Sequence, residues 1–299
     1  MASQPIILRA SDAVARRQLV SRLSRYLFLG STLIGVCVLV VLAYDTIATG
    51  ASRFSFDFIT NYPSRFSEKA GVRPGVLGTL WVLAVTVVAS IPVAIGTAIW
   101  IEEFAPRNRF ITIVKINLAN LAGVPSIIYG ILGLAIFVRF YDMKQSILAG
   151  GLTLALMIIP MTVIAAQEAI RQVPPSLRDG ALALGATRWQ SVRHNVLPNA
   201  IPGIMTGIIL AVSRAAGETA ALIMIGGFTF IRFDPGPPPV NFDALLDSFT
   251  VLPIQIYGYT IDSRREFQAN ASAGIIVLMI GVMTLNLIAA VIRERFRRY

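Results

Sequence analysis

Two charged residues, Arg214 and Glu218, interrupt an otherwise uncharged stretch from residue 194 to 231. They are four residues apart, so we expect them to share one helix face. Charges inside a membrane are costly and tend to mark function. A guanidinium fork suits two oxygens of an oxyanion. The sequence therefore predicts either an ion pair that packs one helix, or an anion contact by Arg214 with Glu218 holding the arginine when no anion is bound.

Hydroxyl and amide side chains near these charges extend the candidate substrate path. The polar residues expected to line it are Ser213, Thr219, Asn120 and Ser126. Pro125 precedes Ser126, and a proline-loosened turn exposes backbone polar groups that a buried path can use. The alternative role for each of these residues is hydrogen bonding between helices.

The elements that position these residues follow from the composition. Of 299 residues only 14% are charged and 55% are hydrophobic, against about 25% charged in an ordinary soluble domain. Six uncharged runs are each near or above the length of about 20 residues that crosses a bilayer. They cover 26–44, 74–101, 116–138, 145–167, 194–213 and 267–292. The sequence predicts an all-α integral membrane protein with six transmembrane helices.

Lysine and arginine set the expected orientation, because cytoplasmic loops carry more of them. With the N-terminus inside, 16 fall on the cytoplasmic side and 9 on the opposite side. We expect a basic cytoplasmic arm (1–25), a six-helix transmembrane domain (26–292) and a basic cytoplasmic tail (293–299). Within the domain we expect a long cytoplasmic loop (about 168–199) and an extracytoplasmic loop (232–266). Both termini are then cytoplasmic, and nucleic-acid binding is a poor explanation of the basic charge.

Several kinds of site are absent from this sequence. Cys37 and His194 are the only residues of their types, so a Cys/His metal site within one chain is excluded. None of the three lysines follows a glycine, which excludes a P-loop for phosphates. We expect no catalytic residues, metal or cofactor in this chain. If transport uses ATP, then ATP and Mg must be bound by other subunits.

The loop between the fourth and fifth spans predicts two short helices across the membrane face. Pro174 and Pro175 stop one helix, and Ser176 is the expected N-cap of the next, with Asp179 as its capping-box partner. That helix is expected over 177–184, with Gly185 ending it in a left-handed turn and Thr187 capping a second short helix. An apolar face without a partner inside the bundle predicts a docking site. It comprises Leu177, Ala181, Leu184 and Trp189.

The same loop resembles the coupling loop of ABC-importer permeases. The matching positions are Asp179, Gly180, Ala181, Gly185, Leu197 and Pro198, with departures at Asp179, Gly180 and Asn195. Four further segments resemble the PstA-type permease subunits of phosphate-specific ABC importers. They are Pro63-Ser64-Arg65-Phe66, Gly123-Val124-Pro125-Ser126-Ile127, Arg214-Ala215-Ala216-Gly217-Glu218-Thr219-Ala220 and Val251-Leu252-Pro253-Ile254-Gln255. Some members carry Arg-Thr-Thr-Glu where this chain has Ile164-Ala165-Ala166-Gln167.

The resemblance implies a fold like that of type I ABC-importer permeases, in the cytoplasmic membrane of a prokaryote. It implies inward phosphate transport driven by ATP hydrolysis on separate subunits. The implied partners are a homologous PstC-like permease, two PstB-like ATP-binding subunits and an extracytoplasmic PstS-like phosphate-binding protein. The alternatives are a permease for molybdate or sulfate, an ion-coupled secondary carrier, and an intramembrane enzyme. The last would need paired acids, metal ligands or a nucleophile with its base.

Overall fold

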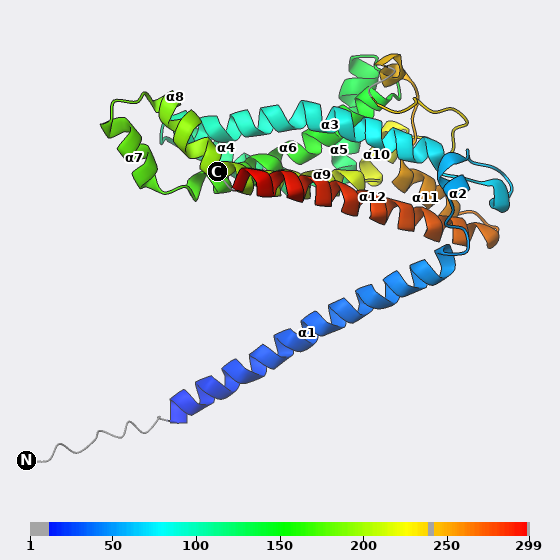
Figure 1. Ribbon diagram of the computed structural model, residues 1–299, viewed down its shortest axis with the longest axis horizontal. Coiled ribbons are helices and arrows are strands. Elements are labelled where there is room, and N and C mark those ends of the chain that lie inside the picture. Colours follow the sequence, from blue (N-terminus) through cyan, green and yellow to red (C-terminus); the bar gives the residue numbers. More distant parts are fainter. Residues whose placement is uncertain (1–11, 239–241, 298–299) are drawn as a thin grey trace, which may run out of the picture. The chain divides into compact units, whose positions relative to one another are not determined.

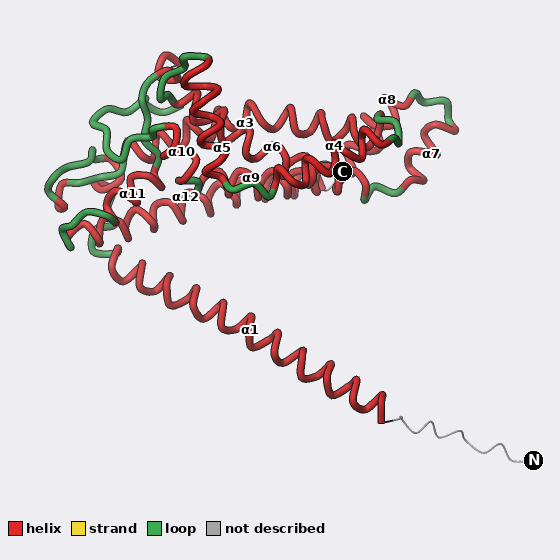
Figure 2. The backbone as a smooth tube through the Cα atoms, turned by 180° about the vertical axis from the view of Figure 1, so that it is seen from behind, coloured by secondary structure: helices red, strands yellow, loops and turns green. Residues whose placement is uncertain are grey.

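The computed structural model describes residues 12–238 and 242–297, which form helices and connecting loops (Figure 2). Five helices in this part of the chain are long and apolar enough to cross a membrane, and a bent pair of helices supplies a sixth span. The expectation of six spans is therefore met if the bent pair is one span. The described chain divides into two units, one ending at Thr49 and one beginning at Gly50.

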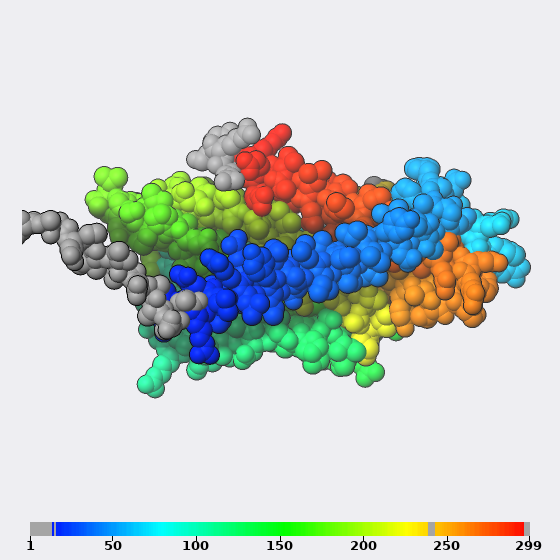
Figure 3. All heavy atoms as spheres, turned by 90° about the horizontal axis from the view of Figure 1, so that it is seen from below, coloured from blue at the N-terminus to red at the C-terminus, as the bar shows by residue number. Residues whose placement is uncertain are grey.

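The first unit consists of α1 (Asp12–Gly50) up to Thr49. Its most apolar 18-residue window has a mean hydropathy of 2.4 and none of it is buried within the protein. The space-filling view shows the side chains that project from this helix (blue) along its length (Figure 3). The expected basic arm falls partly in this helix, over residues 12–25, and its first eleven residues lie outside the described part of the chain. A helix so apolar requires lipid or another protein around it.

Four long helices run lengthwise through the second unit (Figure 1). They are α3 (Arg73–Ile99), α6 (Ile147–Arg171), α9 (Leu197–Ala216) and α12 (Glu266–Arg297). Short segments extend two of them: η2 (Trp100–Phe104) follows α3, while α8 (Arg188–Ser191) and η4 (Val192–Val196) lead into α9. One end of this unit carries α8 and α7 (Pro175–Ala183), and the other carries α2 (Phe56–Thr60) and α11 (Leu252–Thr260).

Small residues allow the central helix α6 to approach its neighbours closely. A side chain at Gly203 would lie 2.7 Å from Ala169 Cβ, and one at Gly207 would lie 2.5 Å from Ala165 Cβ. Nearer the start of α6, Thr86 of α3 donates a hydrogen bond to the Gly151 carbonyl at 3.0 Å. Helices in lipid associate through such small-residue contacts and interhelical hydrogen bonds, since the surrounding lipid removes the hydrophobic driving force between them.

The third expected span is broken. Helix α4 (Arg109–Ala122) meets α5 (Ser126–Gly133), which continues as η3 (Leu134–Phe140), at an angle of 100°. Pro125 at this junction has no N–H to continue the helix. The Tyr129 hydroxyl donates to the Leu121 carbonyl at 2.9 Å and ties the two arms together. The uncharged run 116–138 is therefore a bent pair and not a straight helix.

A polar network closes the end of the second unit that carries α2 and α11. Gln255 is fully buried, accepts from the Gly75 N–H at 3.1 Å and donates to the Gly71 carbonyl at 2.8 Å. The Tyr259 hydroxyl donates to the same carbonyl at 2.7 Å. Burial raises the pKa of Tyr259 to about 12. The segment Val251–Gln255 is thus core and packs against the start of α3.

The proline-rich loop after residue 231 is fixed at the same end through Asp234. Its carboxylate accepts from Arg73 Nε at 2.8 Å, from the Tyr62 hydroxyl at 2.5 Å and from the Gly236 N–H at 2.9 Å. Burial alone would raise the pKa of Asp234, but these hydrogen bonds and the charge of Arg73 outweigh it and lower the pKa. The bond to Asp234 raises the pKa of Tyr62.

Candidate substrate path and coupling surface

Arg214 lies in the last turn of α9, which ends at Ala216 with Gly217 as its C-cap. The side chain is exposed, and its Nη1 lies 3.9 Å from the sulfur of Met161. Met161 belongs to α6, so the guanidinium of Arg214 lies against that helix. A cation is favourable at a helix C-terminus because the last carbonyls carry partial negative charge.

The expected ion pair between Arg214 and Glu218 does not form. The helix stops between them, so the spacing of four residues no longer puts them on one face. Glu218 instead accepts a hydrogen bond from the Ala221 N–H at 3.3 Å, at the start of α10 (Ala220–Ile225). No ion pair of Arg214 occurs in the described residues. Each charge therefore stabilises its own helix end, and Arg214 keeps an unneutralised guanidinium.

Of the polar residues predicted near Arg214, some make hydrogen bonds within the fold and others lie at the surface. Ser213 Oγ lies 2.7 Å from the Ile209 carbonyl and 2.5 Å from Asn286 Oδ1 of α12, so it joins two helices. Thr219 Oγ1 lies 3.5 Å from the Gly217 carbonyl, which is a weak contact. Asn120 is exposed near the end of α4, and Ser126 is half-buried at the first turn of α5. Within the described residues neither hydrogen bonds to Arg214.

The two interrupted helices lie against each other. A side chain at Gly130 of α5 would lie 2.6 Å from the Ala221 carbonyl of α10, so the arms that follow the two breaks pack at backbone distance. Val124, in the break of the third span, packs against the buried apolar cluster to which Ala211 and Ala215 of α9 belong. Irregular backbone at membrane depth is tolerated where it is covered by protein or lines a cavity. The structure therefore places Arg214 at a junction of two helix breaks.

The coupling loop forms the two predicted short helices with a glycine turn. Gly185 has φ of +85°, and the N–H of Ala186 bonds to the Ala181 carbonyl at 3.1 Å. Thr187 caps α8 through a capping box with Gln190. The prediction of Ser176 as N-cap was wrong: the N-cap is Pro174 and the helix begins at Pro175, since proline is favoured in a first turn. Asp179 consequently has no capping partner there and is exposed.

Three of the four residues of the predicted docking face lie on one surface. Leu177, Ala181 and Leu184 line a hollow of about 540 Å³ together with Gly180. Leu184 is 91% exposed, a large value for a leucine. Trp189 does not line this hollow, since its ring packs against Phe104 with centroids 6.3 Å apart. Pro198 lies in the first turn of α9, just after the π-helical turn η4. Lacking an N–H, it fits a widened helical turn.

A buried ion pair anchors α7, the first of the two short helices in the coupling loop (the coupling helices α7 and α8). This pair was not predicted from the sequence. Arg178 Nη2 and Nε donate to Glu103 Oε1 at 2.8 and 3.0 Å. The same guanidinium donates to the carbonyls of Val173 and Ile170 at 2.6 and 2.8 Å. The Glu103 side chain is 8% exposed. The available signal was the acidic pair Glu102-Glu103 in an otherwise basic loop.

Comparisons with known proteins agree with this arrangement. A family model described as binding-protein-dependent transport system inner membrane component matches residues 70–298. The probable ABC transporter permease protein YqgI of Bacillus subtilis is 32% identical over 281 residues, covering 91% of this chain and 95% of that protein. The phosphate transport system permease protein PstA 1 of Mycobacterium tuberculosis is 28% identical over 296 residues, covering 97% and 92%.

Solved structures show the same fold at low sequence identity. A chain of a bacterial ABC transporter involved in import of the acidic polysaccharide alginate aligns with a TM-score of 0.61 at 15% identity, covering 93% of this chain and 99% of that one. A chain of the inward-facing MetNI methionine ABC transporter aligns with a TM-score of 0.56 at 18% identity, covering 73% and 94%. The architecture is that of type I ABC-importer permeases.

Proposed function

Because this chain belongs to the family of binding-protein-dependent transport system inner membrane components, and is thus a multi-pass permease subunit of an ABC importer, we propose that its substrate is inorganic phosphate. Permease subunits of this kind are not enzymes themselves. The transported anion would move inward across the inner membrane. The proposal is supported by relatives named as PstA phosphate permeases that align over nearly the whole chain.

The observation that carries the proposal is the unneutralised guanidinium of Arg214 at the junction of two broken helices. Arginine stays protonated, and its planar fork can donate two hydrogen bonds to one oxyanion. The anion replaces part of its hydration with these bonds as it leaves water. Glu218 is engaged with the Ala221 N–H, so it does not compete for Arg214 in this arrangement. If Glu218 released that N–H, its carboxylate could turn toward Arg214 and weaken anion binding for release.

The energy for transport would come from other subunits. ATP and Mg would be bound by two ATP-binding subunits that dock at the coupling loop, through the exposed face of Leu177, Ala181 and Leu184. A homologous PstC-like permease would supply the other half of the path. An extracytoplasmic PstS-like protein would deliver phosphate. Movement of the docked subunits would reach the spans through Arg178 and Glu103, which join α7 to the end of the second span.

The test is transport by the reconstituted complex. Proteoliposomes that contain this chain with its permease and ATP-binding partners, given the binding protein and internal ATP, should accumulate labelled phosphate. Sulfate and molybdate, each supplied at the same concentration, should neither accumulate nor compete. Uptake of sulfate or molybdate in preference to phosphate would assign the chain to another oxyanion. Accumulation that persists without ATP or ATP-binding subunits would instead indicate an ion-coupled carrier.

A further inference from the structure

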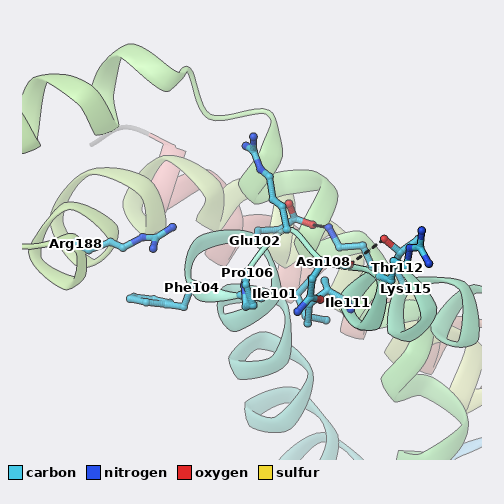
Figure 4. Close-up of a pocket in the computed structure, with 12 residues that line it drawn as sticks. Ile101, Glu102, Phe104, Pro106, Asn108, Ile111, Thr112, Lys115 and Arg188 are labelled. Atoms are coloured by element: carbon cyan, nitrogen blue, oxygen red, sulfur yellow. Dashed lines mark hydrogen bonds and ion pairs between the residues drawn. The ribbon is translucent and has the colours of Figure 1, made fainter.

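A cleft of about 1100 Å³ opens at the end of the protein that carries the coupling helices. It lies between η2, the start of α4 and α8. Figure 4 shows Phe104 and Arg188 on one side of the cleft, with Asn108, Thr112 and Lys115 on the other. It is separate from Arg214, and nothing in the proposed transport step uses it.

The cleft carries an excess of positive charge. Four cations line it, namely Arg107, Arg109, Lys115 and Arg188, against a single carboxylate. That carboxylate, Glu102, is already bonded to Lys115 at 2.8 Å and to Arg171 at 2.9 Å. It therefore has little capacity to neutralise the remaining cations.

Two of the four cations have no partner in the part of the chain that the structure describes. Within the described residues, neither the Arg107 nor the Arg109 side chain makes a hydrogen bond, ion pair or ring contact, and both residues are exposed. Arg188 lies over the Phe104 ring at 5.6 Å, an arrangement that leaves its N–H groups available. Arg107 and Arg109 also flank Asn108, the N-cap of α4, where the helix dipole adds positive potential. An anion in the cleft would relieve this accumulation of positive charge.

We propose that this cleft binds a phosphate group, held by the guanidinium forks of Arg107, Arg109 and Arg188. The group could belong to the headgroup of an anionic phospholipid or to free inorganic phosphate, since both present the same oxygens. The cleft is large for a single ion and fits a headgroup better. The next turns of α4 expose Phe110 and Ile113, 64% and 56% exposed, which offer an apolar surface for acyl chains. Basic clefts between spans on the cytoplasmic side bind acidic headgroups in this way.

A phosphate group in the cleft would affect the coupling between the ATP-binding subunits and the spans, because the cations of the cleft come from separate elements. Arg188 belongs to the second coupling helix, whereas Arg107 and Arg109 precede and begin the third span. One bound phosphate group would join them. The inference does not rest on which substrate the transporter carries.

The experiment measures binding to the assembled transporter in nanodiscs. Native mass spectrometry would count phosphatidylglycerol retained from mixed phosphatidylglycerol and phosphatidylcholine bilayers. Arg107→Gln with Arg109→Gln should lower its retention on the order of tenfold. The matched control, Arg193→Gln with Arg295→Gln, removes two exposed cations outside the cleft and should change retention less than twofold. Arg107→Lys with Arg109→Lys keeps both charges and should retain most of the lipid.

A second arm distinguishes the two sources of the phosphate group. The transporter in pure phosphatidylcholine is titrated with inorganic phosphate, and binding is followed by calorimetry without the binding protein. If the variant Arg107→Gln with Arg109→Gln loses phosphate binding while the control variant keeps it, the cleft is a site for free phosphate. Selective retention of phosphatidylglycerol without phosphate binding assigns it to a lipid headgroup. If the cleft and control variants behave alike toward both probes, the proposal is overturned.

Discussion

Two arginines at helix ends have opposite environments. Arg178, at the base of the first coupling helix, is surrounded by acceptors: one buried carboxylate and two backbone carbonyls. Arg214, beside the break after α9, has only the sulfur of Met161 within bonding distance and no acidic partner in the described chain. The first guanidinium holds structure together. The second retains its hydrogen-bonding capacity, which is what a site for a passing anion requires.

The difference shows that a charge in a span must be judged by its partners as well as its position. Both arginines occur near carboxylates in the sequence or the fold, yet only one forms a pair. Glu103 is held by Arg178 because two segments distant in sequence, the end of the second span and residues 170–178, converge there. Glu218 is held by the backbone of α10, because its helix ended two residues earlier.

The largest effect is expected from removing the anchored arginine. Arg178→Met leaves the Glu103 carboxylate buried without a partner, which costs about 3 kcal/mol or more. We expect a marked fall in the melting temperature of the detergent-solubilised complex and loss of the ATP-binding subunits on purification. Arg171→Met is the control, because Glu102 keeps Lys115 at 2.8 Å. Equal melting temperatures for the two variants would show that the Arg178 anchor contributes no more than an exposed pair.

A smaller effect is expected at the turn of the anchored segment. Gly185 has φ of +85° and open space around it. A side chain there therefore suffers backbone strain of about 1 kcal/mol and no clash. Gly185→Glu should insert in the membrane normally but lose most ATPase association in co-purification. Gly185→Asn, which tolerates this conformation, should retain it. If Gly185→Glu retains association and transport, the loop is not the docking element.

Asp234, at the end of the second unit that carries α2 and α11, offers a third test of what pairing contributes. Its pKa is lowered in the folded protein, so its contribution is present above the unfolded pKa of about 3.9 and is lost as pH falls through the folded value. The protection factors of the amides in residues 232–237, which correct for the slower intrinsic exchange in acid, should therefore fall below about pH 4. In the Asp234→Asn variant, these amides should exchange faster at neutral pH, because the free energy of local opening falls by about 1 to 2 kcal/mol. The variant should also lose the acid dependence. An unchanged acid dependence in that variant would assign it to another group.

The smallest expected effect is an interaction energy near zero. In a double-mutant cycle of Arg214→Met and Glu218→Met, the two stability changes should add to within about 0.5 kcal/mol, because the residues are not paired. A buried ion pair would behave differently: either single change would cost several kcal/mol and the double change would recover it. Thermal melting of the assembled complex measures the cycle.

Local signals in the sequence predicted most of the local features correctly, with the N-cap at Ser176 as an exception. The glycine turn at Gly185 and the cap at Thr187 depend on conformations that neighbouring residues determine. Long uncharged runs likewise predicted the spans, because hydrophobic length is a property of the segment itself. The family and the inner-membrane location followed from motif residues spread along the chain.

Features that depend on tertiary contacts were missed or wrong. The spacing of Arg214 and Glu218 predicts a shared face only if the helix continues, and packing of α10 against α5 at Gly130 favours a break instead. Gly123 and Pro125 are residues that favour a break in the third span. The uncharged run around them, however, does not indicate in which direction the second arm of the span turns. The pair of Arg178 and Glu103 joins residues 75 positions apart, and a charge count cannot match such partners.

The central claim is that Arg214 is free to contact the transported anion, and phosphate uptake by Arg214 variants tests it most directly. Reconstituted complexes of Arg214→Met and Arg214→Lys would be compared with wild type for uptake, ATPase association and melting temperature. We predict near-normal assembly in both, abolished uptake for Arg214→Met, and strongly reduced uptake for Arg214→Lys because the fork is lost. Normal phosphate uptake by a well-assembled Arg214→Met complex would contradict the account.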